Sequence, residues 1–264
     1  MKVKTTELKG NKGVLRIEDA EMYFVNSLRR VMLADLPKLA IDDVIIYDNT
    51  SALFDEIIAH RLGLIPIPTD LSVLSFRNDC KCGAKGCPSC TVRYTLSKEG
   101  ECVVYSGDLQ PEHPSFAITE TTIPIVELAK DQRIILEVEA VLGRGKDHAK
   151  WQVVLAPRYR MDTVISFDKK RINDVKAFLE ELPKDLLVEI KGDKLELKDE
   201  SKLPIFESYL EKNKDNLITI TKDPKKLTFS FETDGSISAK AALQESVAIL
   251  SKKYEEFRGL LKDI

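Results

Sequence analysis

Four of the five cysteines in this 264-residue chain lie in one short segment, and no other feature limits the fold so strongly. The four are Cys80, Cys82, Cys87 and Cys90. Disulfides between residues this close in sequence would close almost no loop and would add little stability. Four thiolates at this spacing are instead typical of a tetrahedral metal site, and zinc favours such an all-sulfur ligand set. Gly83, Gly86 and Pro88 supply the tight turns that the loop needs.

This cysteine loop predicts a structural zinc site. With all four coordination positions taken by sulfur, no water molecule could bind the metal and be activated. Metal ligation in zinc-finger peptides is worth about 10–16 kcal/mol, so the metal would order the loop. Two alternatives stay open, namely another metal or an iron–sulfur cluster, and a metal-free loop of reduced or oxidised cysteines. Cys102 stands apart in a strand-like run and is expected to be a small buried apolar residue.

Residues 24–35, FVNSLRRVMLAD, predict an amphipathic helix that ends before Pro37. Arg29 and Arg30 lie beside its apolar stripe. The stripe consists of Phe24, Leu28, Val31 and Met32.

A second, longer helix is predicted at the C-terminus. Ser236 or Ser238 would cap it, and it would run to about residue 262. Its large apolar residues follow a seven-residue repeat, and we call them the α-helical seam: Leu243, Val247, Leu250, Tyr254, Phe257 and Leu261.

A narrow seam of this kind favours a partner helix, although burial against the chain's own sheet is also compatible with the pattern. Burying six large side chains would contribute roughly 9–18 kcal/mol. Association itself costs some 4–15 kcal/mol, so more contact surface is needed. We therefore expect the helix at 24–35 to form part of the same interface.

Composition excludes several classes of protein. With 40 Lys+Arg and 43 Asp+Glu the net charge is −3, which argues against a protein that mainly binds nucleic acid. No apolar run approaches the roughly 18–20 residues that span a bilayer. The N-terminal residues MKVKTTELKG have no apolar segment typical of a secretory signal. We expect a cytoplasmic protein whose partners are proteins or small molecules, with no membrane contact.

A charged segment from Asp168 to Lys226 predicts a small inserted α+β unit. It carries 14 basic and 14 acidic residues, so its surface should be a solvated mixture of charges. Turn signals separate its elements at Pro183, Gly192-Asp193 and Pro204. The expected elements are helices at 170–181 and 204–213 and strands at 186–190, 194–197 and 217–221. Elsewhere we expect a helix at 53–64 and strands at 40–48, 91–96, 102–105, 133–142 and 151–156.

No catalytic motif is recognisable. The chain has no Walker loop, no G-x-G-x-x-G after a strand and no G-x-S-x-G. His60 reads as a packing residue, His148 lies in a glycine- and lysine-containing loop, and neither has a second ligand at metal-binding spacing. We expect no catalytic residues.

Three segments together resemble one known family. NSLRRVMLADLP (26–37), SALFDEIIAHRLGLIPI (51–67) and GRGKDHAKW (143–151) are similar to the D subunit of archaeal RNA polymerase. That family is related to the third-largest subunit of eukaryotic RNA polymerase II and to the bacterial alpha subunit. FSFETDGS (229–236) and the helix after it match as well, so the resemblance covers essentially the whole chain.

The resemblance implies an α+β fold of three parts. Residues 1–39 and 225–264 would form an alpha-subunit-like dimerisation domain, residues 40–167 a second, mixed domain with the cysteine loop, and residues 168–224 a ferredoxin-like insertion. Both terminal helices would pack against a smaller L subunit in a heterodimer. This heterodimer would be the platform on which the large catalytic subunits of the polymerase assemble, with little or no nucleic-acid contact of its own.

One departure from the family is informative. Many members carry an iron–sulfur cluster in the insertion, but residues 168–226 contain no cysteine here, so no thiolate-bound cluster is expected. The four clustered cysteines correspond to a different loop, which binds zinc in the eukaryotic relatives. An alternative function, a free-standing zinc-stabilised homodimeric adaptor, is also compatible with the sequence.

Overall fold

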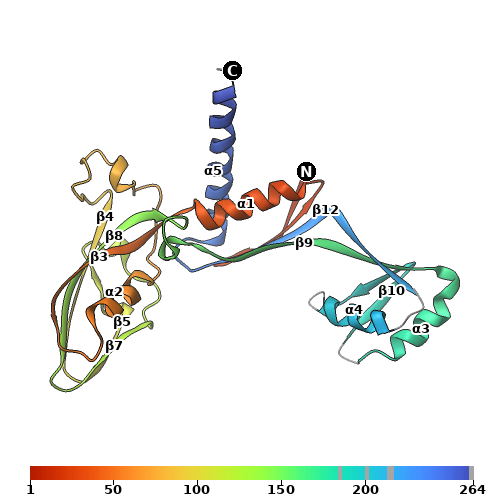
Figure 1. Cartoon of the computed structure of the whole chain (residues 1–264), viewed down its shortest axis with the longest axis horizontal. Helices are drawn as coiled ribbons and strands as arrows, with labels where there is room; N and C mark the ends of the chain where they lie inside the picture. The colour runs from red at the N-terminus through yellow and green to blue at the C-terminus, as the bar shows by residue number, and fades with distance from the viewer. Residues whose placement is uncertain (184–185, 200–201, 213–216, 262–264) are drawn as a thin grey trace. The chain divides into compact units, whose positions relative to one another are not determined.

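The computed structural model describes residues 1–183, 186–199, 202–212 and 217–261 (Figure 1). It packs into two compact units. The smaller unit contains residues 1–2, 17–22 and 160–228, and the larger unit contains residues 3–16, 23–159 and 229–264. Helices and sheets occur in both, so the fold is α+β as predicted. The three-domain division stays a prediction. Among the described residues, no helix is long and apolar enough to cross a membrane.

Strands from the two ends of the chain pair in one sheet. Strands β1 (Lys2–Lys9) and β2 (Lys12–Glu18) pair in the order β1-β2-β12-β9 with the ends of two long strands, β9 (Val154–Phe167) and β12 (Ile218–Thr233). The backbone N–H of Thr233 donates to the carbonyl oxygen of Asn11 at 2.8 Å. This pairing joins the first residues of the chain to the last strand.

The two predicted helices are present in this part. Helix α1 (Met22–Ala34) replaces the expected 24–35, and α5 (Ala239–Leu260) begins after Ser238. The Ser238 hydroxyl accepts a hydrogen bond from the N–H of Ala241 at 3.3 Å, so Ser238 is the cap. Ser236 instead donates to Asp234 at 2.6 Å.

The rest of the larger unit is built on a four-stranded sheet. Its order is β3 (Pro37–Asn49), β8 (Arg133–Arg144), β4 (Thr91–Glu99) and β6 (Gln110–Pro111). Helix α2 (Asp55–Gly63) and a two-stranded sheet of β5 (Cys102–Tyr105) and β7 (Pro124–Leu128) add to it. Apolar residues at alternate positions of β4 and β8 form the core with Ile58 and Leu62 of α2. Short 3-10 helices lie at Arg77–Asp79, Ser106–Asp108, Pro114–Phe116 and Ala149–Trp151.

The smaller unit has a core of its own. The far halves of β9 and β12 continue into the order β12-β9-β11-β10, with β11 (Lys194–Leu197) and β10 (Val188–Lys191) paired as a hairpin. A 3-10 turn (Lys169–Arg171) leads into α3 (Ile172–Glu180), and α4 (Leu203–Lys212) is the second helix. The buried apolar set includes Phe178 and Phe206, whose rings meet edge to face at 6.2 Å. The predicted helices and strands of this segment are therefore confirmed, with changed bounds: α3 and β10 are shorter than expected, β11 has the expected range, and the strand expected at 217–221 is the start of the longer β12. The second helix begins one residue earlier than expected, and residue 213 lies outside the described residues.

Candidate functional site

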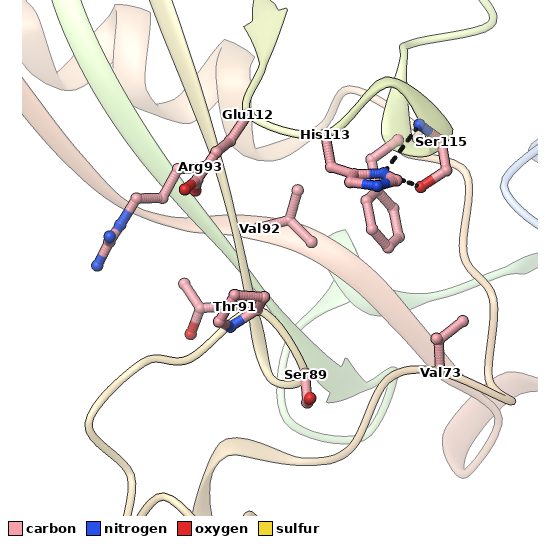
Figure 2. Close-up of a pocket in the computed structure, with 10 residues that line it drawn as sticks. Val73, Ser89, Thr91, Val92, Arg93, Glu112, His113 and Ser115 are labelled. Atoms are coloured by element: carbon pink, nitrogen blue, oxygen red, sulfur yellow. Dashed lines mark hydrogen bonds between the residues drawn. The ribbon is translucent and has the colours of Figure 1, made fainter.

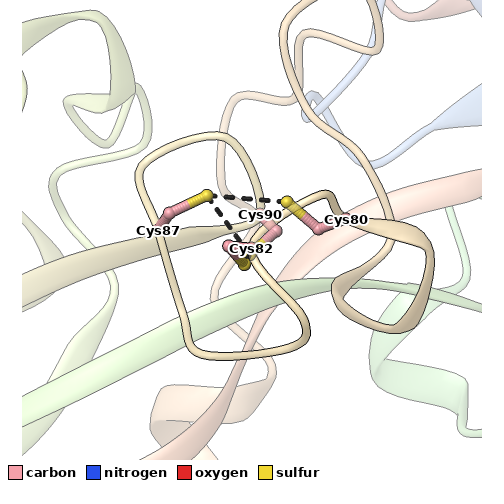
Figure 3. Close-up of side chains that lie close together, drawn as sticks. All are labelled: Cys80, Cys82, Cys87 and Cys90. Carbon is pink, nitrogen blue, oxygen red and sulfur yellow. Dashed lines mark hydrogen bonds between the residues drawn. The ribbon is translucent and has the colours of Figure 1, made fainter.

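The four clustered cysteines converge on one point (Figure 3). The Sγ atoms of Cys80 and Cys87 lie 3.5 Å apart, those of Cys82 and Cys90 3.7 Å apart, and those of Cys87 and Cys90 3.9 Å apart. All four sulfurs lie within 4.8 Å of one another. The predicted ligand set is therefore gathered as its spacing indicated.

This geometry fits a tetrahedral thiolate site. With zinc–sulfur bonds of about 2.3 Å, the sulfurs of a regular tetrahedron lie about 3.8 Å apart. The three sulfur–sulfur separations given above bracket that value. Cys90 is buried and the other three are half-buried, so the centre lies near the surface with its inner side against the sheet. The cysteine cluster is thus able to bind a metal ion.

The thiols differ in acidity. The pKa of Cys82 is lowered to about 6, chiefly because the backbone N–H of Cys87 donates to its sulfur and further because of the Cys80 side chain. The backbone of Cys82 and the side chain of Ser75 lower the pKa of Cys80. Burial raises the pKa of Cys90 to about 11. The loop thus favours the thiolate at two of the four sulfurs before any metal binds.

The backbone of the loop needs left-handed conformations at three positions. Gly83 has φ +66° and Gly86 φ +83°, which confirms their role in the turns. Ala84 has φ +63°, where an L-residue is strained. An alanine does not indicate a left-handed conformation, so this third position could not be predicted.

Arg77 ties the loop to the sheet, and the cysteine pattern did not predict it. Its guanidinium lies 3.5 Å from Asp43 of β3 and 3.4 Å from Glu139 of β8. Its Nε donates to the carbonyl oxygen of Ala84 at 3.3 Å. The arginine therefore joins the loop to two strands of the sheet. Only its position just before the first cysteine could have suggested such a role.

The predicted interface residues of α1 are mostly covered by the chain itself. Leu28, Val31 and Met32 are buried, and Phe24 is half-buried. Tyr23, which was not among the predicted residues, is 71% exposed next to Met22. The large apolar side chains of α1 that remain exposed therefore lie in its N-terminal turn.

The chain itself covers only part of the α-helical seam of α5. Within the seam, Leu250 is buried and Leu243 is half-buried. The other buried residues of α5 are not seam residues: Ala239, Ala242 and Ser246. Beyond Leu250 every described residue is exposed, and this end of α5 extends clear of the other elements of its unit (Figure 1). The exposed seam residues are Val247, Tyr254, Phe257 and Leu261, and Leu260 lies beside them. The Nζ of Lys253 in α5 forms an ion pair with the carboxylate of Asp35 at 2.7 Å, which connects α5 to the residue just after α1.

The remaining candidates have structural roles. Cys102 is half-buried and packs against the core, less deeply than expected. In the segment GRGKDHAKW, a side chain at Gly143 would overlap the ring of Trp151. The Nδ1 of His148 accepts a hydrogen bond from the N–H of Lys150 at 3.0 Å, which caps a short helix.

Comparison with known proteins gives a consistent result. Residues 43–164 match the family described as the RNA polymerase Rpb3/RpoA insert domain. The chain is 35% identical to the DNA-directed RNA polymerase subunit Rpo3 of Picrophilus torridus, over 98% of this chain and 97% of the relative. It is 36% identical to Rpo3 of Methanosphaera stadtmanae, over 100% of this chain and 99% of the relative. With Rpo3 of Pyrobaculum neutrophilum it shares 50% identity over 54% of this chain and 55% of the relative.

Proposed function

This chain belongs to the Rpo3, or D-subunit, family of archaeal RNA polymerase, and we propose that it is a non-catalytic assembly subunit of that enzyme. In this proposal it forms a heterodimer with the smaller L subunit. The heterodimer is then the platform on which the large catalytic subunits assemble. The exposed end of α5 is the observation that carries the proposal.

Four apolar seam residues, one just before Leu250 and three beyond it, are about half exposed or more within the described chain. Their exposed fractions are 46% for Val247, 53% for Tyr254, 60% for Phe257 and 51% for Leu261. A cluster of large exposed apolar side chains on one helix face marks an interaction site. Leu250 of the same seam is already buried and Leu243 is half-buried, so a partner helix would continue an existing core.

Binding to a co-expressed L subunit tests this interface. Tyr254→Asp with Phe257→Asp should weaken the heterodimer at least about 100-fold, because two aromatic side chains lose their buried contacts. Lys252→Asp is the matched control, since it changes the net charge by the same amount. Lys252 lies about 140° around the helix from Val247, away from the seam.

The outcome separates the two functions. If the double variant keeps its helix content and still binds L with unchanged affinity, the proposed interface is wrong. A stable homodimer of the chain that ignores L would instead favour the free-standing adaptor.

We also propose that the cysteine loop holds one structural zinc ion through its four cysteines. The sulfur separations and the lowered thiol pKa values support this. Purified protein should contain about one equivalent of zinc, and only Cys102 should react with a thiol reagent before denaturation. Less than half an equivalent of zinc, with five reactive thiols, would contradict the proposal.

A further inference from the structure

One edge of the four-stranded sheet is open beside the cysteine loop. Strand β4 is nine residues long, but β6 pairs only with its residues Tyr94 and Thr95. After β6, the N–H of Glu112 donates to the carbonyl oxygen of Arg93 at 2.9 Å, and the chain then turns into a 3-10 helix. On the other side, the N–H of Ser75 donates to the carbonyl oxygen of Ser89 at 2.9 Å. Between these two bonds, the N–H of Thr91 donates to the carbonyl oxygen of Cys87 at 2.9 Å, so the uncovered part of the β4 edge is the short stretch from the carbonyl of Thr91 to the N–H of Arg93.

Two backbone groups point out of this opening. In a β-strand of an antiparallel pair, the N–H and C=O of one residue point to the same side of the strand. The N–H and C=O of the residue two positions further along point to that same side. Because the carbonyl of Arg93 faces Glu112, the N–H of Arg93 and the carbonyl of Thr91 also face the opening. Within the part of the chain that the structure describes, neither group has a hydrogen-bond partner. Such unpaired groups on an edge favour addition of another strand.

A cavity of about 430 Å³ lies at the same place (Figure 2). Its apolar lining comes from Val73, Pro88, Val92 and Phe116. Figure 2 shows Val92 turned toward the side of the cavity that His113 and Ser115 line. The cavity is large enough for one large apolar side chain.

We propose that this opening holds an extended segment of another polymerase subunit, added to β4 as a short parallel strand. In a parallel pair, one residue lies opposite Val92, donates to the carbonyl of Thr91 and accepts from the N–H of Arg93. Side chains directly opposite each other share one face of a sheet, so the side chain of that residue enters the cavity. One residue thus satisfies both backbone groups and fills the apolar space.

Two features restrict the incoming segment. The bonds at Ser89 and Glu112 leave room for very few residues, which suits a chain end or a short loop and excludes a long exchanged strand. Two charged side chains border the cavity: Arg93, which forms an ion pair with Glu139 at 3.0 Å, and the exposed Glu112, whose carboxylate has only a longer-range attraction to Arg93 among the described residues. An apolar residue next to Lys or Arg therefore fits best. This inference rests on membership of the polymerase and not on the L subunit or on zinc.

Amide hydrogen exchange gives the first test. We expect the N–H of Arg93 to exchange at least tenfold more slowly in the assembled polymerase than in the full chain alone. The N–H of Tyr94 faces β8 in both states and serves as the internal reference. Equal exchange of the Arg93 amide in both states would overturn the proposal.

Photo-crosslinking gives the second test. A benzophenone amino acid at Ser115 in the assembled polymerase should crosslink to a peptide of a different subunit. The same probe at Ser97, exposed on β4 away from the cavity, is the positional control. Crosslinks from Ser115 only to this chain or to a second copy of it, or none at all, would overturn the proposal.

A variant that blocks the cavity links the two readouts. Val73 is 60% exposed, so Val73→Glu should leave the fold intact while placing a charge at the cavity mouth. It should restore fast exchange at Arg93 in the polymerase and reduce the Ser115 crosslink at least tenfold. Val103→Glu, at a 37% exposed position on β5, is the matched control. Unchanged exchange and crosslinking in Val73→Glu would contradict the proposal.

Discussion

The cysteine loop and the charged insertion are both additions to a sheet, yet different forces hold them in shape. Residues 77–90 include no large apolar residue, and Cys90 is the one fully buried side chain. The insertion has no cysteine but buries a set of apolar side chains: Ile165, Phe167, Val175, Phe178, Leu182, Leu186, Leu195, Leu197, Phe206 and Leu217. A short segment is too small to build an apolar core, whereas the longer one is not. The loop therefore depends on its sulfurs, and the insertion does not need a cluster.

Metal removal should produce the largest difference between the two regions, because it should disorder the cysteine loop and leave the insertion folded. Chelation, or Cys82→Ser with Cys87→Ser, should abolish the order of residues 77–90, because ligation is worth about 10–16 kcal/mol in comparable peptides. Amide exchange of the loop should accelerate by at least two orders of magnitude. The insertion should keep its exchange pattern, and its loss on chelation would break the comparison.

A core substitution should have the reverse effect. Phe206 is fully buried, so Phe206→Ala should destabilise the smaller unit by about 3–5 kcal/mol. Urea unfolding monitored by hydrogen exchange would measure this, and zinc content should not change. Ile205→Ala, at the adjacent 47% exposed position, is the control and should cost much less. Similar losses for both variants would contradict the role assigned to this core.

Acid should affect the loop alone. A proton competes with the metal at each thiol whose pKa exceeds the pH, which costs about tenfold in affinity per pH unit. Protonation of Cys90, whose pKa is raised to about 11, competes with zinc binding throughout the neutral range. Protonation of Cys82 competes as well only below its pKa of about 6. Competition with a coloured chelator should therefore show zinc affinity falling more steeply below pH 6.

The insertion provides the reference for this experiment. Its buried set contains no ionisable side chain, so its circular dichroism should stay constant from about pH 8 to about pH 5. A constant slope of zinc affinity across pH 6 would contradict the assignment of Cys82 as the most acidic ligand.

The smallest expected effect concerns turn conformation. Gly192 has φ +69° in the hairpin of the insertion, but the loop uses Ala84 at φ +63°. Ala84→Gly should remove strain of roughly 1–2 kcal/mol, offset by the greater freedom of glycine when unfolded. Zinc affinity should rise by up to about fivefold. Ser89→Gly, where φ is not positive, should give no gain, and weaker binding by Ala84→Gly would show that the turn is unstrained.

The cysteine cluster could be predicted because its spacing involves only a few neighbouring residues. Arg77 was missed because its partners Asp43 and Glu139 lie on strands far away in the sequence. The seven-residue repeat of α5 correctly marked an apolar stripe. A repeat does not reveal which chain covers each part of that stripe, so the division at Leu250 needed coordinates.

The helices and strands, too, could be predicted where a pattern runs over several neighbouring residues. Alternation predicted β4, β5 and β8, and helical spacing predicted α1, α2 and α5. Strand β6 has two residues and β7 has five, too few for a period to stand out. The expected strand at 151–156 was wrong at its start, since Trp151 ends a short helix, and β9 continues to Phe167.

The hydrogen bond between Thr233 and Asn11 affects how the protein is made. During translation, the second strand emerges from the ribosome long before β12, its neighbour in the sheet, exists. Lys38 likewise awaits Asp234, its ion-pair partner at 2.5 Å in a nearly dry environment. The N-terminal segment of the nascent chain therefore cannot complete its folding until synthesis is almost finished, and until then it needs protection from aggregation.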